Sequence, residues 1–323
     1  MSTPKRLSRV SASSVKALTQ CSLAFYYERV LGLPTKEWPR TIMGTLAHSL
    51  FECLRRARHR HHYDAITTVP GKVDWEASPV VARLVRWYKR KHGIGDDLIA
   101  DLNGMLEVGM LLIDYHWTQA DLHSVSGVPL VYGPEHEFLL KLDDDTQIKG
   151  FIDDMAVVGG IMRVRDYKSA RNRFTASELP NNVQAALYQL YIWHAFQLPA
   201  EVHFIALRHP PTKRTPQKHL QIVPPASPAQ LAGLETYVKA IAARVRQFTM
   251  EDAMTSPCDD LGFCQRVCTH YAPHPYWIVC RADDPTQSPV SSHLSLDKAA
   301  ESCDHAHIVI ERSHPGCLAH YRS

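Results

Sequence analysis

The sequence predicts a mixed α/β protein in which a helical front precedes a core of strands and helices. Up to about residue 120, apolar residues recur at spacings of three and four, which is the period of an amphipathic helix. Between residues 134 and 223 the pattern changes to short runs rich in Ile, Val, Phe and Leu, which indicate strands. One helical segment lies among these strands and another follows them. The expected architecture is therefore one α/β core with an inserted helical lobe.

The helical front opens with hydroxyl residues that can cap a helix. Residues 11–14 precede an apolar face that runs over residues 15–26, and this helix should end near Gly32 and Pro34. A second helix is expected to begin around residues 41–44. Two further helical patterns span residues 79–91 and 97–120.

The core elements follow in the order strands, helix, strands, helix. Expected strands span residues 134–142, 147–158, 161–167, 201–207 and 220–223. Turn residues separate the first three strands, namely Asp143 to Asp145 and Gly159-Gly160. Helices are expected over residues 182–196 and from Ser227-Pro228 to about Phe248. After about Tyr271 the periodicity is lost, which predicts an irregular C-terminal extension.

Composition places the chain among ordinary globular proteins. It has 323 residues, 45% of them apolar and 21% charged, with 36 Lys and Arg against 33 Asp and Glu. No run approaches the roughly 18 apolar residues of a membrane span, and the start lacks the apolar region of a secretory signal. We therefore expect a cytoplasmic protein without a membrane partner. Its eight cysteines are then more typical of thiols or metal ligands than of disulfides.

The net charge of +3 does not decide whether the partner is a nucleic acid, but the local clustering of charge is more informative. Basic side chains gather in four stretches, residues 55–62, 83–92, 163–173 and 208–219. Each stretch is either a path for phosphates or an ordinary solvated surface.

An acidic hairpin carries the chemistry that the residues alone predict. A two-residue turn at Gly159-Gly160 pairs Val158 with Ile161, and the same register places Asp153 opposite Asp166. Opposed side chains lie about 4.5 to 5.5 Å apart, where two carboxylates repel each other unless a cation lies between them. Lys168 follows Asp166 by two residues, so strand alternation puts both on one face.

Two carboxylates and an ammonium suit phosphodiester hydrolysis. Carboxylates hold Mg²⁺ or Mn²⁺, and such a metal polarises a phosphate and lowers the pKa of a bound water. Lys168 could orient that water or neutralise charge on the phosphate. The alternative is a longer turn, which slips the register and turns one aspartate to solvent.

Five segments together resemble the PD-(D/E)XK nucleases, and specifically their RecB-like branch. Gly150 to Asp153 and Asp166 to Lys168 resemble the G-x-I-D and D-Y-K elements of this branch. Gly44 to His48 resembles its G-T-x-x-H helix, and Gln184 to Tyr188 its Q-x-x-x-Y helix. Residues 21–33 resemble its opening C-P-x-x-F-Y segment, with Ser22 where proline is usual. The matches cover roughly residues 11–270 in the expected order.

The resemblance implies a restriction-endonuclease-like mixed sheet flanked by helices and a divalent-metal-dependent DNA nuclease, in particular an exonuclease on single strands or DNA ends. Its implied catalytic residues are Asp153, Asp166, Lys168, Gln184 and Tyr188. Its implied ligands for Mg²⁺ or Mn²⁺ are His48, Asp153, Asp166 and the backbone carbonyl of Tyr167. Glu137 is a further candidate, for a second metal.

A cysteine cluster near the C-terminus predicts a second kind of metal. Cys258, Cys264 and Cys268 lie close in sequence, as thiolate ligands of an iron-sulfur cluster or Zn²⁺ do. The resemblance implies a [4Fe-4S] cluster with Cys21 as the fourth ligand, as in AddB-type nucleases and CRISPR-associated exonucleases. The spacing departs from that of the family, so Cys280 or His270 could replace one ligand. Zn²⁺ and unligated thiols are the alternatives.

These features give one expected domain and one expected partner. Residues 1–270 form a nuclease domain with a helical lobe at about 41–126, a catalytic core at about 127–250 and cysteines at 258–268, while residues 271–323 form the extension. The expected contacts to DNA phosphates are Arg55, Arg56, Arg163, Arg165, Arg171 and Arg173.

The expected role is DNA repair, recombination or the processing of foreign DNA. No phosphate loop of a helicase occurs in the sequence, so unwinding would need a helicase or other DNA-processing partner. The alternative functions are a catalytically silent DNA-binding or assembly module with the same fold, and a zinc-stapled interaction protein.

Overall fold

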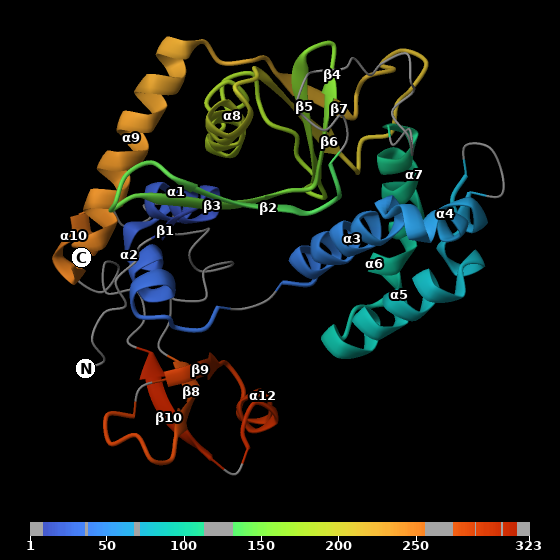
Figure 1. Cartoon of the computed structure of the whole chain (residues 1–323). Coiled ribbons are helices and arrows are strands. Elements are labelled where there is room, and N and C mark those ends of the chain that lie inside the picture. The colour runs from blue at the N-terminus through green and yellow to red at the C-terminus, as the bar shows by residue number, and fades with distance from the viewer. Residues whose placement is uncertain are drawn as a thin grey trace. The chain divides into compact units, whose positions relative to one another are not determined.

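The computed structural model describes residues 9–35, 38–67, 72–112, 132–255, 274–287, 289–304 and 306–314. The chain divides into two compact units, each built from separate stretches of sequence (Figure 1). One unit comprises residues 37–140 and 148–236, and the other comprises residues 1–36, 141–147 and 237–323. Helices and strands alternate in the first unit around a mixed sheet, so the predicted α/β class is confirmed.

The central sheet of the first unit has the strand order β4-β5-β6-β7. These strands are β4 (Asp154–Val158), β5 (Ile161–Lys168), β6 (Ala200–Ala206) and β7 (Leu220–Val223). β5 and β6 are parallel, and the other two pairs are antiparallel. The register predicted from the Gly159-Gly160 turn is confirmed, because Val158 pairs with Ile161 and Asp154 pairs with Arg165. Both glycines have positive φ angles, which such a turn requires.

Helices cover both faces of this sheet (Figure 1). The helix α8 (Val183–Phe196) connects the parallel strands, and its N-cap residue Asn182 accepts a hydrogen bond from the backbone N–H of Ala185. On the opposite face, the ring of Phe51 in α3 (Pro39–Arg55) stacks on Tyr167 of β5 with a centroid distance of 4.3 Å. Because side chains alternate along β5, Asp166 and Lys168 face α8 while Tyr167 faces α3.

The helical lobe builds its core around α3. Its other elements are the 3₁₀ turns Ala57–His59 and Trp75–Ala77, α4 (Arg60–Ile66), α5 (Pro79–His92), α6 (Asp96–Ala100) and α7 (Leu102–Leu112). Leu46, Leu50, Val85 and Leu106 are buried together in this core. The single helix predicted over residues 97–120 is instead two helices as far as residue 112, and its remainder lies outside the described residues.

A hairpin of β2 (His136–Lys141) and β3 (Gln147–Ile152) precedes β4. The sequence predicted one strand over residues 147–158, but Asp153 interrupts it and β4 begins at the next residue. Gly150 lets this hairpin pack closely, since a β-carbon there would lie 2.5 Å from the Phe138 ring. The interruption at Asp153 matters for the site, because it frees this side chain from the regular alternation of a strand.

The second unit contains both ends of the chain. Its N-terminal elements are β1 (Arg9–Val10), α1 (Ala12–Gln20), α2 (Ser22–Phe25) and a π-helical turn (Tyr26–Val30). The helix predicted from Ser11 to Gly32 is broken at Cys21, which has an extended backbone. α9 (Pro228–Arg246) enters this unit and is followed by α10 (Met250–Thr255). Phe25 and Phe248 pack edge to face in its core at a centroid distance of 5.3 Å.

The C-terminal residues also form regular structure, which corrects the predicted irregular extension over residues 271–323. β8 (His274–Arg281), β9 (Pro289–His293) and β10 (His307–His314) form an antiparallel sheet in the order β10-β8-β9, together with the short helix α12 (Leu296–Glu301). The sequence signal was weak because β9 and β10 are mostly exposed or half-buried, so their residues need not alternate between apolar and polar.

Within the described residues, none of the helices combines the length and the apolar character that crossing a membrane requires.

Candidate active site

His48 reaches the acidic hairpin from α3. A β-carbon on Gly44 would lie 2.6 Å from Ser169 Oγ, so α3 approaches the end of β5 closely and a larger residue would require the Ser169 side chain to shift. One helical turn later, the Nδ1 atom of His48 lies 3.2 Å from Asp153 Oδ1 and 3.9 Å from Glu135 Oε1. The G-T-x-x-H segment therefore positions an imidazole against a carboxylate.

Asp153 lies at the break between β3 and β4. Its Oδ2 atom accepts a hydrogen bond of 2.8 Å from the backbone N–H of Tyr167, and only 8% of the residue is exposed. This bond leaves Oδ1 directed at His48. The carboxylate is thus held by the neighbouring strand at one oxygen and presented to the site at the other.

Glu135 completes a group of three candidate metal ligands with His48 and Asp153. One ligand atom of each residue lies within 4.8 Å of the other two. Glu135 has a φ angle of 54°, and its backbone N–H donates to the carbonyl of Asp153 at 3.1 Å. A positive φ angle is uncommon outside glycine, so the turn before β2 holds this side chain in a special position.

Glu135 is a candidate ligand that the sequence motifs did not indicate, and Glu137 was predicted in its place. Glu137 is 57% exposed and forms an ion pair with Lys149, so it does not belong to the site. The available signal was the turn pair Gly133-Pro134 directly before Glu135, because a residue in a turn need not follow the side-chain alternation of the strand that comes after it.

Asp166 and Lys168 form a second cluster with the residues of α8. Lys168 Nζ lies 2.6 Å from Asp166 Oδ2 and donates a hydrogen bond of 2.7 Å to Gln184 Oε1. Gln184 Nε2 donates to Asp166 Oδ1 at 2.7 Å and to the hydroxyl of Tyr188 at 2.6 Å. Tyr188 is in turn 2.8 Å from the carbonyl of Phe151. The Q-x-x-x-Y helix thus clamps both the lysine and the aspartate.

The two clusters are joined electrostatically. Burial raises the pKa of Asp153 to about 6, and the neighbouring charge of Asp166 adds to the effect. Burial lowers the pKa of His48, but hydrogen bonds to Asp153 and Glu135 outweigh it and raise this pKa to about 10. In the protein without a bound metal, the imidazolium of His48 thus offsets the negative charge of the neighbouring carboxylates. A divalent cation could take over this role once His48 gives up its proton.

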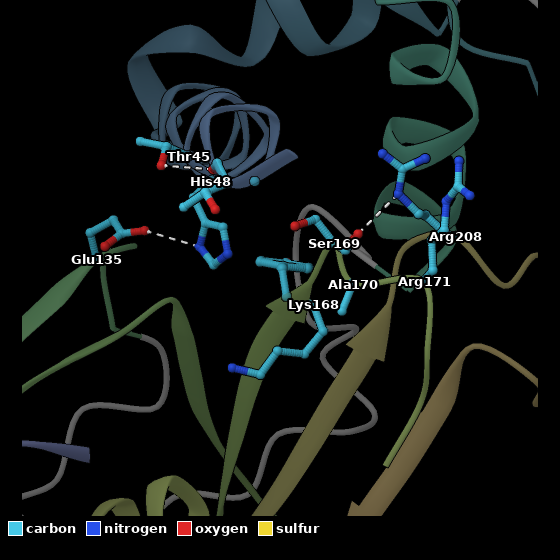
Figure 2. A pocket seen from close by; sticks show the side chains of 11 residues that line it. Thr45, His48, Glu135, Lys168, Ser169, Ala170, Arg171 and Arg208 are labelled. Carbon is cyan, nitrogen blue, oxygen red and sulfur yellow. Dashed lines mark hydrogen bonds and ion pairs between the residues drawn. The ribbon is translucent and has the colours of Figure 1, made fainter. Parts of the chain in front are cut away.

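A pocket of about 630 Å³ opens beside these residues (Figure 2). Figure 2 shows His48 and Glu135 facing each other on one side of it and Lys168 on the adjacent strand. Arg171 and Arg208 line the pocket beyond Ser169, and Arg208 Nε donates to the carbonyl of Ser169 at 2.9 Å. The complete lining is Thr41, Gly44, Thr45, His48, Glu135, Tyr167, Lys168, Ser169, Ala170, Arg171 and Arg208.

Two of the arginines predicted to contact phosphates are instead buried, which corrects that part of the prediction. Arg55 lies 2.5 Å and Arg165 lies 3.4 Å from oxygens of Asp154, a carboxylate with no exposed surface. A guanidinium that is buried and paired in this way is not available to a phosphate backbone.

The other four predicted arginines lie at or near the surface. Arg56 pairs with Glu52 and Arg163 with Glu201, while Arg173 donates to the carbonyl of Leu220. Of the six, Arg171 is the residue that lines the pocket.

The predicted iron-sulfur ligands Cys258, Cys264 and Cys268 lie outside the described residues, as does His270. Cys21 is described at the N-cap of α2, where its Sγ atom accepts a hydrogen bond from the backbone N–H of Ala24 at 3.4 Å. Cys280 is buried in β8 and donates to the carbonyl of Gln287.

Comparison with known proteins identifies the family. The sequence model of the PD-(D/E)XK nuclease superfamily matches residues 9–272, which is most of the chain. The chain therefore belongs to the PD-(D/E)XK nuclease superfamily, as the sequence motifs predicted. No curated protein matches this chain.

Solved structures with some likeness to this chain include a protein from Eubacterium rectale described as a "putative exonuclease". It shares 10% sequence identity with a TM-score of 0.43, over 80% of this chain and 87% of that chain. SSO0001 shares 12% identity with a TM-score of 0.28, over 73% of this chain and 78% of that chain.

Proposed function

We propose that this protein is a divalent-metal-dependent DNA nuclease that hydrolyses phosphodiester bonds, and that it acts as an exonuclease on single strands or DNA ends. The observation that carries this proposal is one pocket lined by His48, Glu135 and Lys168, with Asp153 beside His48 and Asp166 paired with Lys168. Membership of the nuclease superfamily supports hydrolysis as the reaction.

The donor set fits a hard divalent cation. Carboxylate oxygens of Glu135 and Asp153 and one imidazole nitrogen of His48 lie close enough to share one ion. We propose these three residues and Asp166 as protein ligands for Mg²⁺ or Mn²⁺, with the carbonyl of Tyr167 as a further one. When bound, the ion would polarise the phosphate and lower the pKa of a coordinated water.

Lys168 is the proposed group that positions the attacking water and offsets charge on the phosphate. Its ammonium is held by two partners, Asp166 and Gln184, while its side chain remains part of the pocket lining. Gln184 fixes the lysine and the aspartate at once, because its amide accepts from one and donates to the other. Such preorganisation places the charge before the substrate arrives.

Arg171 and Arg208 are the proposed contacts to the DNA backbone next to the scissile phosphate. Both side chains line the pocket, and arginine suits phosphate because its planar donors match two oxygens. The exposed Arg171 replaces the buried Arg55 and Arg165 as the best phosphate ligand among the residues that the sequence indicated.

We also propose a [4Fe-4S] cluster of Cys21, Cys258, Cys264 and Cys268, as in the RecB-like branch. The contact of α2 with α10 supports it, because Ser22 Oγ donates to the carbonyl of Ala253 at 2.6 Å. Cys258 follows Ala253 by five residues, a reach of at most roughly 17 Å. Bound iron would join the ends of the nuclease domain proposed for residues 1–270. Anaerobic purification with iron and zinc analysis tests it, since zinc without iron would favour the zinc site.

The proposed setting is the cytoplasm, in DNA repair, recombination or foreign-DNA processing. A helicase or another DNA-processing protein is the proposed partner for duplex substrates, because the sequence has no helicase phosphate loop.

The decisive experiment uses end-labelled single-stranded and double-stranded DNA with Mg²⁺, Mn²⁺ or EDTA. The proposal expects stepwise shortening from an end in the presence of metal and none in EDTA. Asp166→Ala should lose cleavage and still bind DNA. Binding without cleavage by the wild-type protein under every metal condition would favour the silent DNA-binding module, and cleavage by Asp166→Ala at the wild-type rate would refute the assigned site.

A further inference from the structure

The helix α5 (Pro79–His92) presents an exposed face that the proposed active site does not use. Val81, Ala82 and Val85 are buried against the helical lobe, which fixes the orientation of the helix. The opposite face carries the exposed side chains of Val80, Arg83, Arg86, Trp87, Arg90 and Lys91. At 100° per residue these six positions fall on one side of the helix, so they form one continuous surface. We call it the α5 face.

Trp87 is the unusual member of this face. It is 43% exposed, although its large apolar ring would gain from burial. Its neighbours along the face are cationic: Arg83 precedes it by one helical turn, and Arg90 and Lys91 follow it by one turn. The ammonium of Lys91 lies 4.5 Å from the centroid of the ring. An exposed indole is thus surrounded by positive charge.

Among the described residues, no acidic side chain pairs with the arginines of the α5 face. The helix itself contains no acidic residue. In the part of the chain that the structure describes, Arg83, Arg86 and Arg90 form no ion pair, whereas Lys89 on the flank of the helix pairs with Asp96. This arrangement leaves three guanidinium groups available to an anionic partner.

The α5 face is fixed relative to the active-site helix. The hydroxyl groups of Tyr88 and Ser49 lie 3.0 Å apart, and Ser49 is the neighbour of His48 on α3. Tyr88 in turn stacks on His92 at a centroid distance of 5.5 Å. A ligand on α5 would therefore bind to a helix that is hydrogen-bonded to α3, the helix that carries His48.

We infer that the α5 face binds a single-stranded stretch of nucleic acid, with an unpaired base stacked on Trp87 and neighbouring phosphates on Arg83, Arg86 and Arg90. The inference rests on the proposed function, because it names the substrate class of the nuclease. Alternation of bases and phosphates along a single strand matches a face that offers both an aromatic ring and cations. A duplex keeps its bases stacked inside and would leave Trp87 without a partner.

Binding by the full-length protein in EDTA tests this inference without turnover. Fluorescence anisotropy would compare labelled oligothymidylate with a hairpin duplex. Trp87→Ala should weaken binding of the single strand by about fivefold to a hundredfold, Trp87→Phe should retain most of it, and duplex binding should change less than about twofold. Tyr237→Ala is the matched control, because Tyr237 on α9 is 42% exposed, close to the value for Trp87. Equal binding by wild-type and Trp87→Ala proteins would overturn the inference.

Charge variants supply a second measurement. Arg83→Glu and Arg90→Glu should each flatten the dependence of affinity on salt, by about 0.7 in the logarithmic slope for each lost phosphate contact. Lys16→Glu makes the same change of charge at an exposed position of α1 and should leave the slope unchanged. An unchanged slope in both α5 variants would overturn the assigned phosphate contacts.

A cleavage assay separates failure of this inference from failure of the proposed function. On single-stranded DNA with metal, Trp87→Ala should raise KM and leave kcat unchanged, because stacking far from the scissile bond is equal in ground and transition states. Cleavage with wild-type KM in Trp87→Ala would refute the inference alone. Trp87-dependent binding by a wild-type protein that cleaves no DNA would refute the nuclease and leave the single-strand surface standing.

Discussion

The aspartates at positions 153 and 154 are neighbours in sequence and lie in opposite environments. Asp153 faces His48 in the group of candidate metal ligands, where burial raises its pKa. Asp154 points to the other side of the hairpin, where it lies between the guanidinium groups of Arg55 and Arg165. Asp153 has the imidazolium of His48 beside it, which loses its charge when it is deprotonated. Asp154 has two guanidinium groups beside it, which stay charged. The difference shows that two neighbouring positions of one hairpin separate a candidate metal ligand from a buried ion pair.

The two environments also share a structural element. Arg55 and His48 both belong to α3, so the Arg55–Asp154 ion pair fixes the same helix that presents His48 to Asp153. A buried ion pair of this kind is weak evidence for added stability, since desolvation opposes its attraction. Its value here is geometric, because it ties α3 to β4 next to the candidate metal site.

The largest effect is expected from Asp153→Asn, which tests whether the charge of Asp153 is needed for cleavage. An amide keeps the shape and can still accept from the backbone of Tyr167, but it removes a charged ligand. We expect kcat/KM on single-stranded DNA to fall by about 10³-fold, comparable to removing a group that stabilises the transition state. Steady-state cleavage with saturating Mn²⁺ checks this. Activity within tenfold of wild type would remove Asp153 from the site.

Asp154→Ala is the matched variant on the structural side. It leaves two buried guanidinium groups without their carboxylate, so the free energy of unfolding should fall by about 3 to 5 kcal/mol. Urea denaturation measures this loss. Activity per folded molecule should fall much less than in Asp153→Asn. An Asp154→Ala protein that unfolds at the wild-type urea concentration but is inactive would refute the assignment of Asp154 to stability.

The contrast between these aspartates explains which parts of the site the sequence could predict. The Gly159-Gly160 turn fixed the register of β4 and β5, so the pairing of the two strands and the shared face of Asp166 and Lys168 followed from local geometry. The positions that depend on chain packing did not follow. Glu135 joins the site through a single positive φ angle, which no periodic pattern encodes.

The buried arginines also show that contacts made only in the tertiary structure could not be predicted from the sequence. Arg55 and Arg165 belong to basic stretches, and a basic stretch in the sequence resembles a phosphate path until a buried partner is known. Their partner Asp154 lies 99 positions from Arg55, so only tertiary structure brings them together. The fold class was predictable because helix and strand periods are local. The C-terminal sheet was not, because its exposed strands leave no clear period.

Tyr188→Phe should have a smaller effect on the catalytic side. The variant removes the hydroxyl that accepts from Gln184 and contacts both Asp166 and the carbonyl of Phe151. Gln184 would then hold Lys168 less firmly, and kcat/KM should fall by about 10- to 100-fold, as expected for a partner of a catalytic group. Cleavage by Gln184→Leu, which removes the clamp itself, should be reduced at least as much. A larger loss in Tyr188→Phe would show that the hydroxyl acts on its own.

The smallest expected effect compares two buried or half-buried histidines. His48 in the candidate active site has a raised pKa, while burial lowers the pKa of His203 on β6. His203 accordingly binds a proton more readily in the unfolded chain, near its ordinary pKa of about 6.5, than in the folded one. Its contribution to stability is therefore complete above that pH and is lost as the pH falls towards the folded pKa.

His203→Gln should make the fall in melting temperature between pH 7 and pH 5 shallower without abolishing it, because His136 and His219 also have lowered pKa values. Thermal melts of the protein at four pH values in this range measure the slope. His61→Gln, at an exposed position of α4, should melt with the wild-type slope. If the two variants have the same slope, burial does not hold the pKa of His203 below its ordinary value.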